Sequence, residues 1–149
     1  MIAVIGSAGT IGRHVAAFLE EWGVGVVRRD FRLEGDEYVD ARDSASLSRA
    51  LDGAAVVVNC ADYRLNLDVM RGAAAAGAQV EMRSNGSVVV GTALTRGGSA
   101  KSTSEPAARA AVELAEGRLS APGTSPPEQA IEDPEGFLGL LDTEVRWTS

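Results

Sequence analysis

Short apolar runs alternate with amphipathic stretches through the first half of the chain. Residues 2–5 are wholly apolar, which is typical of a buried strand. From Thr10 to Trp22 the apolar side chains recur at helical spacing instead. The same alternation then predicts strands at 24–28, 38–39, 54–59 and 78–82, and helices at 44–53 and 65–76. Strands that alternate with helices need crossover connections, so the pattern predicts a Rossmann-like, doubly wound α/β fold with a mostly parallel sheet.

The second half of the chain has a different character. Asn85-Gly86 lies between two strand-like runs, and this dipeptide is a strong hairpin signal, so we expect 87–94 to add an antiparallel strand. A polar loop is expected at 97–103, followed by helices at 105–116 and 134–141 and a last strand at 144–147. We therefore predict one domain over 1–149, with a βαβ core at 1–83 and an extension at 84–149.

Composition excludes several classes of protein. The chain has 149 residues, which suits one domain, and its net charge of −7 argues against a nucleic-acid surface. We find no apolar run near the roughly 20 residues of a membrane span, and no basic region of a signal peptide. Cys60 is the single cysteine, so we expect no internal disulfide and no metal site. These features favour the cytoplasm.

A glycine-rich turn follows the first apolar run. Its residues are Gly6, Ser7, Ala8, Gly9, Thr10, Ile11 and Gly12. Three glycines at this spacing, between a strand and a helix, are typical of a dinucleotide phosphate site. The backbone there can approach a pyrophosphate closely, and the N–H groups at the start of the helix can bind it. The alternative is a turn that is tight for packing reasons alone.

The end of the second predicted strand bears on the choice of cofactor. Arg28, Arg29 and the nearby Arg32 favour the 2′-phosphate of NADP, because guanidinium groups bind phosphate in pairs of charge-assisted hydrogen bonds. Asp30 lies 18 residues after the last glycine and could instead accept hydrogen bonds from the ribose of NAD. We favour NADP, and NAD stays open. A solvated strand end is the third interpretation.

Further candidate residues follow the later strands. Asp40 occupies a place that often lies beside adenine in Rossmann proteins, although it could equally cap a helix. Asn59, Cys60 and Ala61 end a buried strand at the edge where cofactors bind in open α/β sheets. Tyr63 and Arg64 could line the nicotinamide end. The chain has no Tyr-x-x-x-Lys pair of a short-chain reductase, and the sequence assigns no catalytic residue.

The stretch 54–78 resembles the saccharopine dehydrogenase family. The resemblance rests on Val57-Val58-Asn59-x-Ala61, Tyr63-x-Leu65-Asn66-Leu67-x-Val69-Met70 and Ala75-Ala76-Gly77, with the glycine turn in agreement. Residues 126–128, Pro-Pro-Glu, and 133–137, Asp-Pro-Glu-Gly-Phe, resemble the C-terminal end of such enzymes. The family's Asp-Leu-Gly signature is missing here, as is almost all of its large substrate domain. The chain looks like the two ends of such a dehydrogenase with the middle removed.

Two functions follow from these observations. The resemblance implies an oxidoreductase that transfers hydride between NADP and a small imine or carbonyl substrate, in which the cofactor supplies the chemistry. The alternative is a non-catalytic module that binds a dinucleotide or a partner. A surface left open by the missing domain would favour a homodimer, because large apolar surfaces are seldom exposed to water.

Overall fold

The computed structural model describes residues 1–76, 79–82, 92–94, 99–119, 127–141 and 144–146. Its centre is a four-stranded parallel sheet in the order β2-β1-β3-β4. These strands are β1 (Ile2–Ile5), β2 (Val26–Arg29), β3 (Val56–Asn59) and β4 (Gln79–Met82). The chain passes from β1 to β2 on one side and then to β3 on the other, so the topological switch point lies between β1 and β3. The predicted Rossmann-like α/β fold is confirmed.

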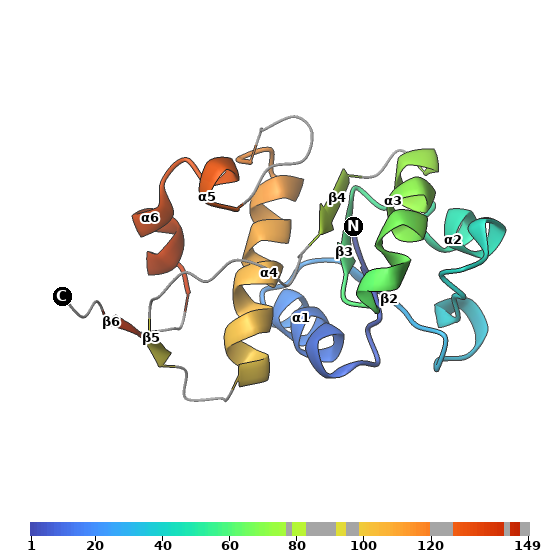
Figure 1. The fold of residues 1–149 in the computed structure, drawn as a ribbon, viewed down its shortest axis with the longest axis horizontal. Helices are drawn as coiled ribbons and strands as arrows, with labels where there is room; N and C mark the ends of the chain where they lie inside the picture. The colour runs from blue at the N-terminus through green and yellow to red at the C-terminus, as the bar shows by residue number, and fades with distance from the viewer. Residues whose placement is uncertain (77–78, 83–91, 95–98, 120–126, 142–143, 147–149) are drawn as a thin grey trace.

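Helices cover both faces of this sheet (Figure 1). Three crossover helices are α1 (Thr10–Glu21), α2 (Ser44–Ala50) and α3 (Asn66–Ala75), and α4 (Ser99–Ala115) packs against α1. Two short 3-10 helices, η1 (Gly35–Glu37) and η2 (Tyr63–Leu65), occupy the loops that follow β2 and β3. Asp43 caps α2, since its carboxylate accepts a hydrogen bond from the backbone N–H of Ala45.

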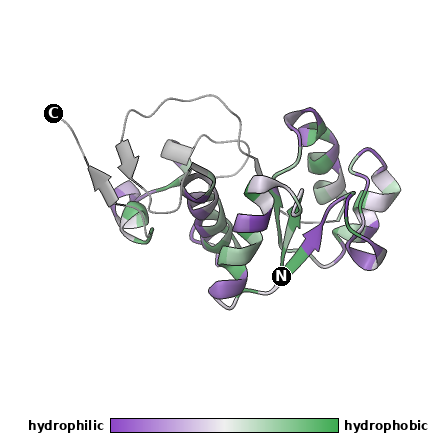
Figure 2. Ribbon diagram, turned by 90° about the horizontal axis from the view of Figure 1, so that it is seen from below, coloured by the Kyte–Doolittle hydropathy of each residue, from purple (hydrophilic) through white to green (hydrophobic). Residues whose placement is uncertain are grey.

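Successive residues of the central strands serve two separate cores. Ile2 and Val4 of β1 face the layer of α1 and α4, whereas Ala3 and Ile5 face the layer of α2 and α3. This alternation follows from the period of two in a strand, and it explains why β1 is apolar throughout. In Figure 2 the longer helices carry both hydrophobic and hydrophilic residues, the pattern of helices with one buried face.

Three expectations need correction. The strand predicted at 38–39 is reduced to a single parallel bridge between Tyr38 and Asp30. The loop expected at 97–103 is helical from Ser99 onward, where Ser104 Oγ donates hydrogen bonds to the carbonyls of Ala100 and Ile11. The turn Asn85-Gly86 lies outside the described residues, and β5 (Thr92–Leu94) does not extend the main sheet but pairs antiparallel with β6 (Glu144–Arg146).

The C-terminal part adds two short helices beside α4 (Figure 1). They are α5 (Pro127–Ala130) and α6 (Pro134–Gly139), and α6 is the helix expected at 134–141. Arg109 of α4 stacks over the ring of Trp22 and donates a hydrogen bond to the carbonyl of Leu140. This contact ties the end of α1 to the residue that follows α6. In the part of the chain that the structure describes, we find no helix long and apolar enough to cross a bilayer.

Candidate functional site

The glycine turn lies where the carboxyl ends of β1, β2 and β3 meet. Backbone N–H groups of Gly6 and Ser7 donate to the carbonyl of Arg29, at 2.8 and 3.2 Å. The N–H of Cys60 donates to the carbonyl of Ile5 at 2.8 Å. These bonds hold the turn against the ends of both neighbouring strands.

Two of the glycines are required by this packing. Gly6 has a φ of +78°, and a Cβ placed there would lie 2.7 Å from the backbone of Cys60 and Ala61. A Cβ on Gly12 would lie 2.2 Å from the carbonyl oxygen of Gly6. Gly9 differs, because its φ of −75° suits any residue and its nearest contacts would be 3.1 Å and longer. Packing therefore requires glycine at Gly6 and Gly12, and it disfavours a side chain at Gly9 less strongly.

The start of α1 is open to an anion. Gly9 is its N-cap residue, no side chain caps the helix within the described ranges, and the first turn holds no acidic residue. The first N–H groups of a helix have no partner in their own helix. Ser7 beside them is buried, and its hydroxyl has no hydrogen-bond partner among the described groups. These donors fit the phosphates of a dinucleotide.

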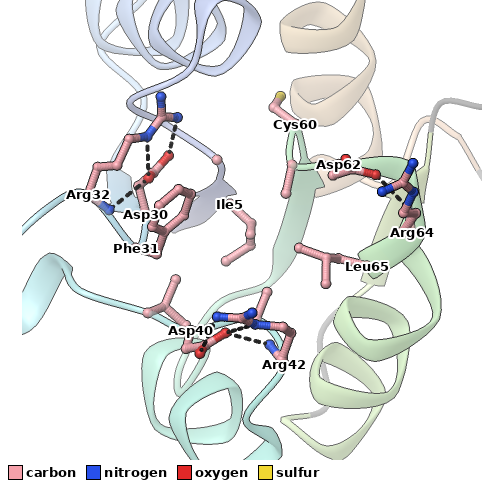
Figure 3. A pocket seen from close by; sticks show the side chains of 14 residues that line it. Ile5, Asp30, Phe31, Arg32, Asp40, Arg42, Cys60, Asp62, Arg64 and Leu65 are labelled. Carbon is pink, nitrogen blue, oxygen red and sulfur yellow. Dashed lines mark hydrogen bonds and ion pairs between the residues drawn. The ribbon is translucent and has the colours of Figure 1, made fainter.

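A pocket of about 450 Å³ opens at the same edge of the sheet (Figure 3). This volume is within the ~300–1,000 Å³ of small-molecule sites. The side chains and backbone around it come from four segments at the carboxyl ends of the strands. The lining residues are Ile5, Gly6, Asp30, Phe31, Arg32, Val39, Asp40, Ala41, Arg42, Cys60, Ala61, Asp62, Arg64 and Leu65.

An ion pair between Asp30 and Arg32 forms one wall of the pocket. The Asp30 carboxylate accepts hydrogen bonds from Ala8 N–H at 3.1 Å and from the backbone N–H, Nε and Nη2 of Arg32 at 2.9 to 3.1 Å. Burial opposes the charge of Asp30, but these bonds outweigh it and hold the pKa of the carboxyl below its usual value. The side chain of Asp30 is only 1% exposed, whereas that of Arg32 is 49% exposed. The group presented to a ligand is therefore the guanidinium.

A second pair, Asp40 and Arg42, has the same form across the pocket. The backbone N–H, Nε and Nη2 of Arg42 each donate to the Asp40 carboxylate at 3.0 Å. These bonds hold the pKa of Asp40 below its usual value. Figure 3 shows both pairs at the pocket, one on either side of Phe31. Asp40 is thus a pocket residue and does not cap α2, which Asp43 does.

Arg28 and Arg29 lie elsewhere, against the sequence expectation. Arg28 makes a two-point ion pair with Glu20 of α1, at 2.8 and 2.9 Å, which raises the pKa of the guanidinium. Arg29 donates from Nε to the carbonyl of Ala50 at 2.8 Å, on the opposite face of the sheet. Neither residue lines the pocket. Within a strand, successive side chains point to opposite faces, so only the residues after β2 reach the edge.

The end of β3 brings together the other predicted residues. Cys60 and Ala61 line the pocket, as does Arg64, whereas Tyr63 does not. Asn59 shapes the loop: its Nδ2 donates to Asn66 Oδ1 at 2.8 Å, and its Oδ1 accepts from Ala61 N–H at 3.1 Å. We find no group of three or more metal-ligating side chains in the described ranges.

Sequence reasoning missed Phe31, Arg42 and Leu65. A signal for two of them was present, because the pattern Asp-x-Arg occurs at 30–32, 40–42 and 62–64. In each copy the backbone N–H of the arginine donates to the aspartate Oδ1, at 2.9 to 3.0 Å. All three copies reach the same pocket.

Comparisons with known proteins give partial structural likenesses. No family model matches the chain, and no curated protein matches it. A short-chain dehydrogenase/reductase superfamily protein from Agrobacterium tumefaciens, with bound NAD, is 30% identical with a TM-score of 0.46 over 52% of this chain and 30% of that chain. A nucleoside-diphosphate-sugar epimerase from Pseudomonas aeruginosa is 20% identical, with a TM-score of 0.45 over 52% of this chain and 30% of that chain.

An NADPH-dependent quinone oxidoreductase from Escherichia coli is 22% identical, with a TM-score of 0.39 over 52% of this chain and 32% of that chain. The chain thus spans about a third of the length of these three proteins. None of the three is described as a saccharopine dehydrogenase, so that resemblance stays a sequence-based hypothesis. At these TM-scores the likenesses do not assign an activity.

Proposed function

We propose that the chain binds NADP(H) across the carboxyl ends of β1, β2 and β3. The observation that carries this proposal is the uncapped start of α1 at Gly9, directly beside the pocket at the switch point of the sheet. Ligands of open α/β sheets bind at such switch points. The pyrophosphate would lie against the glycine turn, where the helix dipole and the N–H groups of the first turn of α1 favour negative charge.

The exposed guanidinium at the pocket supports the phosphorylated cofactor. Asp30 is covered by Arg32 and already accepts four hydrogen bonds, so it is poorly placed to accept ribose hydroxyls. Arg32, with Arg42 beyond Phe31, would hold the 2′-phosphate in place of Arg28 and Arg29. Each arginine uses Nε and Nη2 for its aspartate, so Nη1 would donate to the phosphate while the carboxylate keeps its partner.

The remaining wall supports the adenosine half of the ligand. Val39, Ala41 and Leu65 are apolar lining residues, and Asp40 offers carboxylate oxygens to the amino group of adenine. Cys60 and Ala61, held by the Asn59 loop, would let the middle of the dinucleotide approach the backbone of β3. When bound, the cofactor supplies hydride transfer to or from a small imine or carbonyl substrate, and the protein's part is orientation.

A non-catalytic role in dinucleotide binding is the second candidate. The observation that favours it is the state of the pocket carboxyls. Asp30 and Asp40 both have a lowered pKa, so they are ionised at neutral pH and cannot donate a proton to a substrate. Membership of the saccharopine dehydrogenase family, a cytoplasmic location and a homodimer also belong to the proposal. The mass of the protein in solution, with and without NADPH, tests the homodimer.

Calorimetric titration with NADPH and NADH tests the proposal, and Gly9→Ala is the decisive variant. The new methyl group would lie 3.4 Å from Arg32 Nη2 and 3.1 Å from Gly6 O, a tight contact that requires the backbone to shift by a few tenths of an ångström. It would also block the close approach of a phosphate, so we expect NADPH to bind at least ~10-fold more weakly, a loss of about 1.4 kcal/mol.

Gly25→Ala is the matched control. A Cβ there has no heavy atom within 4 Å, and Gly25 does not line the pocket. The affinity of the Gly25→Ala protein for NADPH should therefore equal that of the wild type. Wild-type protein that binds neither cofactor would refute the proposal. A folded Gly9→Ala variant with unchanged affinity would show that phosphate does not bind at the glycine turn.

A further inference from the structure

Phe31 is exposed within the pocket. Its exposed fraction is 66%, yet it lines the same cavity as the buried Ile5 and Val39. A single exposed aromatic residue on an open surface needs no explanation. An exposed ring inside a ligand-sized pocket is different, because its free face is turned toward whatever binds there.

The loop that carries Phe31 is fixed at both ends. The Asp30 N–H donates to the carbonyl of Glu37 at 3.1 Å, and the Asp30 carbonyl accepts from Val39 N–H at 3.3 Å. The guanidinium carbon of Arg32 lies 5.2 Å from the centroid of the Phe31 ring, a cation–π contact. The ring is therefore held by its neighbours in the loop, although little of it is buried.

The surroundings of the ring match a planar base. Figure 3 shows Phe31, Ile5 and Leu65 directed into the same space from three different segments. Apolar side chains thus face an aromatic ring, while the Asp30–Arg32 and Asp40–Arg42 pairs supply charge at the margins. A heterocyclic base has the same division, with apolar faces and polar edges. Base–aromatic stacking contributes about 1–3 kcal/mol per base in nucleic-acid-binding proteins.

We infer that Phe31 is the stacking platform for the adenine base of the ligand. This inference rests on the proposed binding of NADP(H) and names the residue that recognises the base, as distinct from the phosphates. Arg32 would then contribute to the recognition of both groups, because it is stacked on the Phe31 ring that binds adenine and it also binds the 2′-phosphate.

The test uses two half-cofactors as probes. They are 2′,5′-ADP, which carries the base and the phosphate, and reduced nicotinamide mononucleotide, which lacks adenine. Phe31→Ala should weaken 2′,5′-ADP about 10-fold or more and leave the mononucleotide unchanged. Phe31→Trp should keep the affinity for 2′,5′-ADP and gain an indole fluorescence that this probe quenches, relative to the wild type.

Tyr63→Ala is the matched control. Tyr63 is 69% exposed and is also stacked by the next arginine, with Arg64 at 5.6 Å from the ring centroid, but it does not line the pocket. Its loss should leave the affinity for 2′,5′-ADP unchanged. If the wild type binds NADPH while folded Phe31→Ala binds 2′,5′-ADP normally, the platform is refuted and the proposed function stands. If the wild type binds neither NADPH nor 2′,5′-ADP, both fail together.

Discussion

Two loops of this protein share one sequence pattern but differ in what surrounds them. Residues 30–32, Asp-Phe-Arg, follow β2, and residues 62–64, Asp-Tyr-Arg, follow β3. In both, the arginine N–H donates to the aspartate Oδ1, and the guanidinium lies over the aromatic ring, at 5.2 and 5.6 Å from its centroid. The local turn is the same.

Burial separates the two loops. Asp30 lies under the glycine turn, and its carboxylate binds Ala8 N–H and the Arg32 guanidinium. Asp62 is exposed, and among the described residues its carboxylate accepts a hydrogen bond only from the N–H of Arg64. The comparison teaches that Asp-aromatic-Arg specifies a turn. Contact with the glycine turn is what buries the aspartate of one copy, although both copies reach the pocket.

The largest difference between the two loops is expected in the free energy of unfolding, when the aspartate of each is replaced. Asp30→Ala leaves the half-buried Ala8 N–H and the Nε and Nη2 of Arg32 without their acceptor, so we expect the free energy of unfolding to fall by about 2–3 kcal/mol. Asp62→Ala, at an exposed turn, should cost less than about 1 kcal/mol. Urea unfolding followed by circular dichroism measures the free energy of unfolding of both variants. Equal losses would contradict the difference in burial between the two loops.

Ligand binding should separate the two arginines next. Arg32→Ala should weaken NADPH about 10-fold and NADH much less, because a charge-assisted hydrogen bond contributes about 1.5–3 kcal/mol. Arg64 also lines the pocket but lies in the exposed loop after β3, so Arg64→Ala should weaken NADPH and NADH to the same extent.

The double variant Arg28→Ala, Arg29→Ala tests the original sequence interpretation in the same titration. Both guanidiniums are bound outside the pocket, to Glu20 and to the Ala50 carbonyl, so NADPH and NADH affinities should be lost to the same small extent, if at all. A selective loss of NADPH binding would return the 2′-phosphate to these two residues.

The smallest expected effect is on acid stability. Asp30 has a lowered pKa, so its ionised form stabilises the fold above the unfolded value of about 3.9, and this stabilisation is lost as the pH falls through the native pKa. Asp30→Asn has no ionisable carboxyl group, so it has no such stabilisation to lose at low pH. The gap between wild type and Asp30→Asn in urea midpoint should therefore shrink between pH 6 and pH 3, and a constant gap would contradict the assignment.

Much of the fold was predictable because the apolar runs and the glycine turn indicate the same order of strands and helices. The apolar runs at 2–5 and 56–58 are buried on both faces, which is why neither shows alternation. The glycine turn between β1 and α1 needs Gly6 and Gly12 for packing. The start of α4 was missed because serine-rich sequence has low helix propensity, and its contacts with α1 come from far along the chain.

The site was harder to predict than the fold. Arg28 and Arg29 have the right chemistry, but their positions inside β2 direct them to opposite faces of the sheet. Arg32 and Phe31 lie in a loop whose course is set by two backbone hydrogen bonds, from Asp30 N–H to Glu37 and from Val39 N–H to Asp30. No periodicity in the sequence indicates such bonds. Loop residues reveal their direction only in three dimensions.

The contrast among the glycines of the turn also bears on how this protein could diverge. Gly6 and Gly12 are held by backbone atoms only 2.2 to 2.8 Å from where a Cβ would lie, so every folded descendant must retain them, whatever it binds. Gly9 is less constrained, because a Cβ there would lie 3.1 Å from the carbonyl oxygen of Gly6, a tight contact but not an impossible one. A related protein that no longer bound a nucleotide would therefore keep Gly6 and Gly12. Only a substitution at the middle glycine, Gly9, would indicate that binding had been lost.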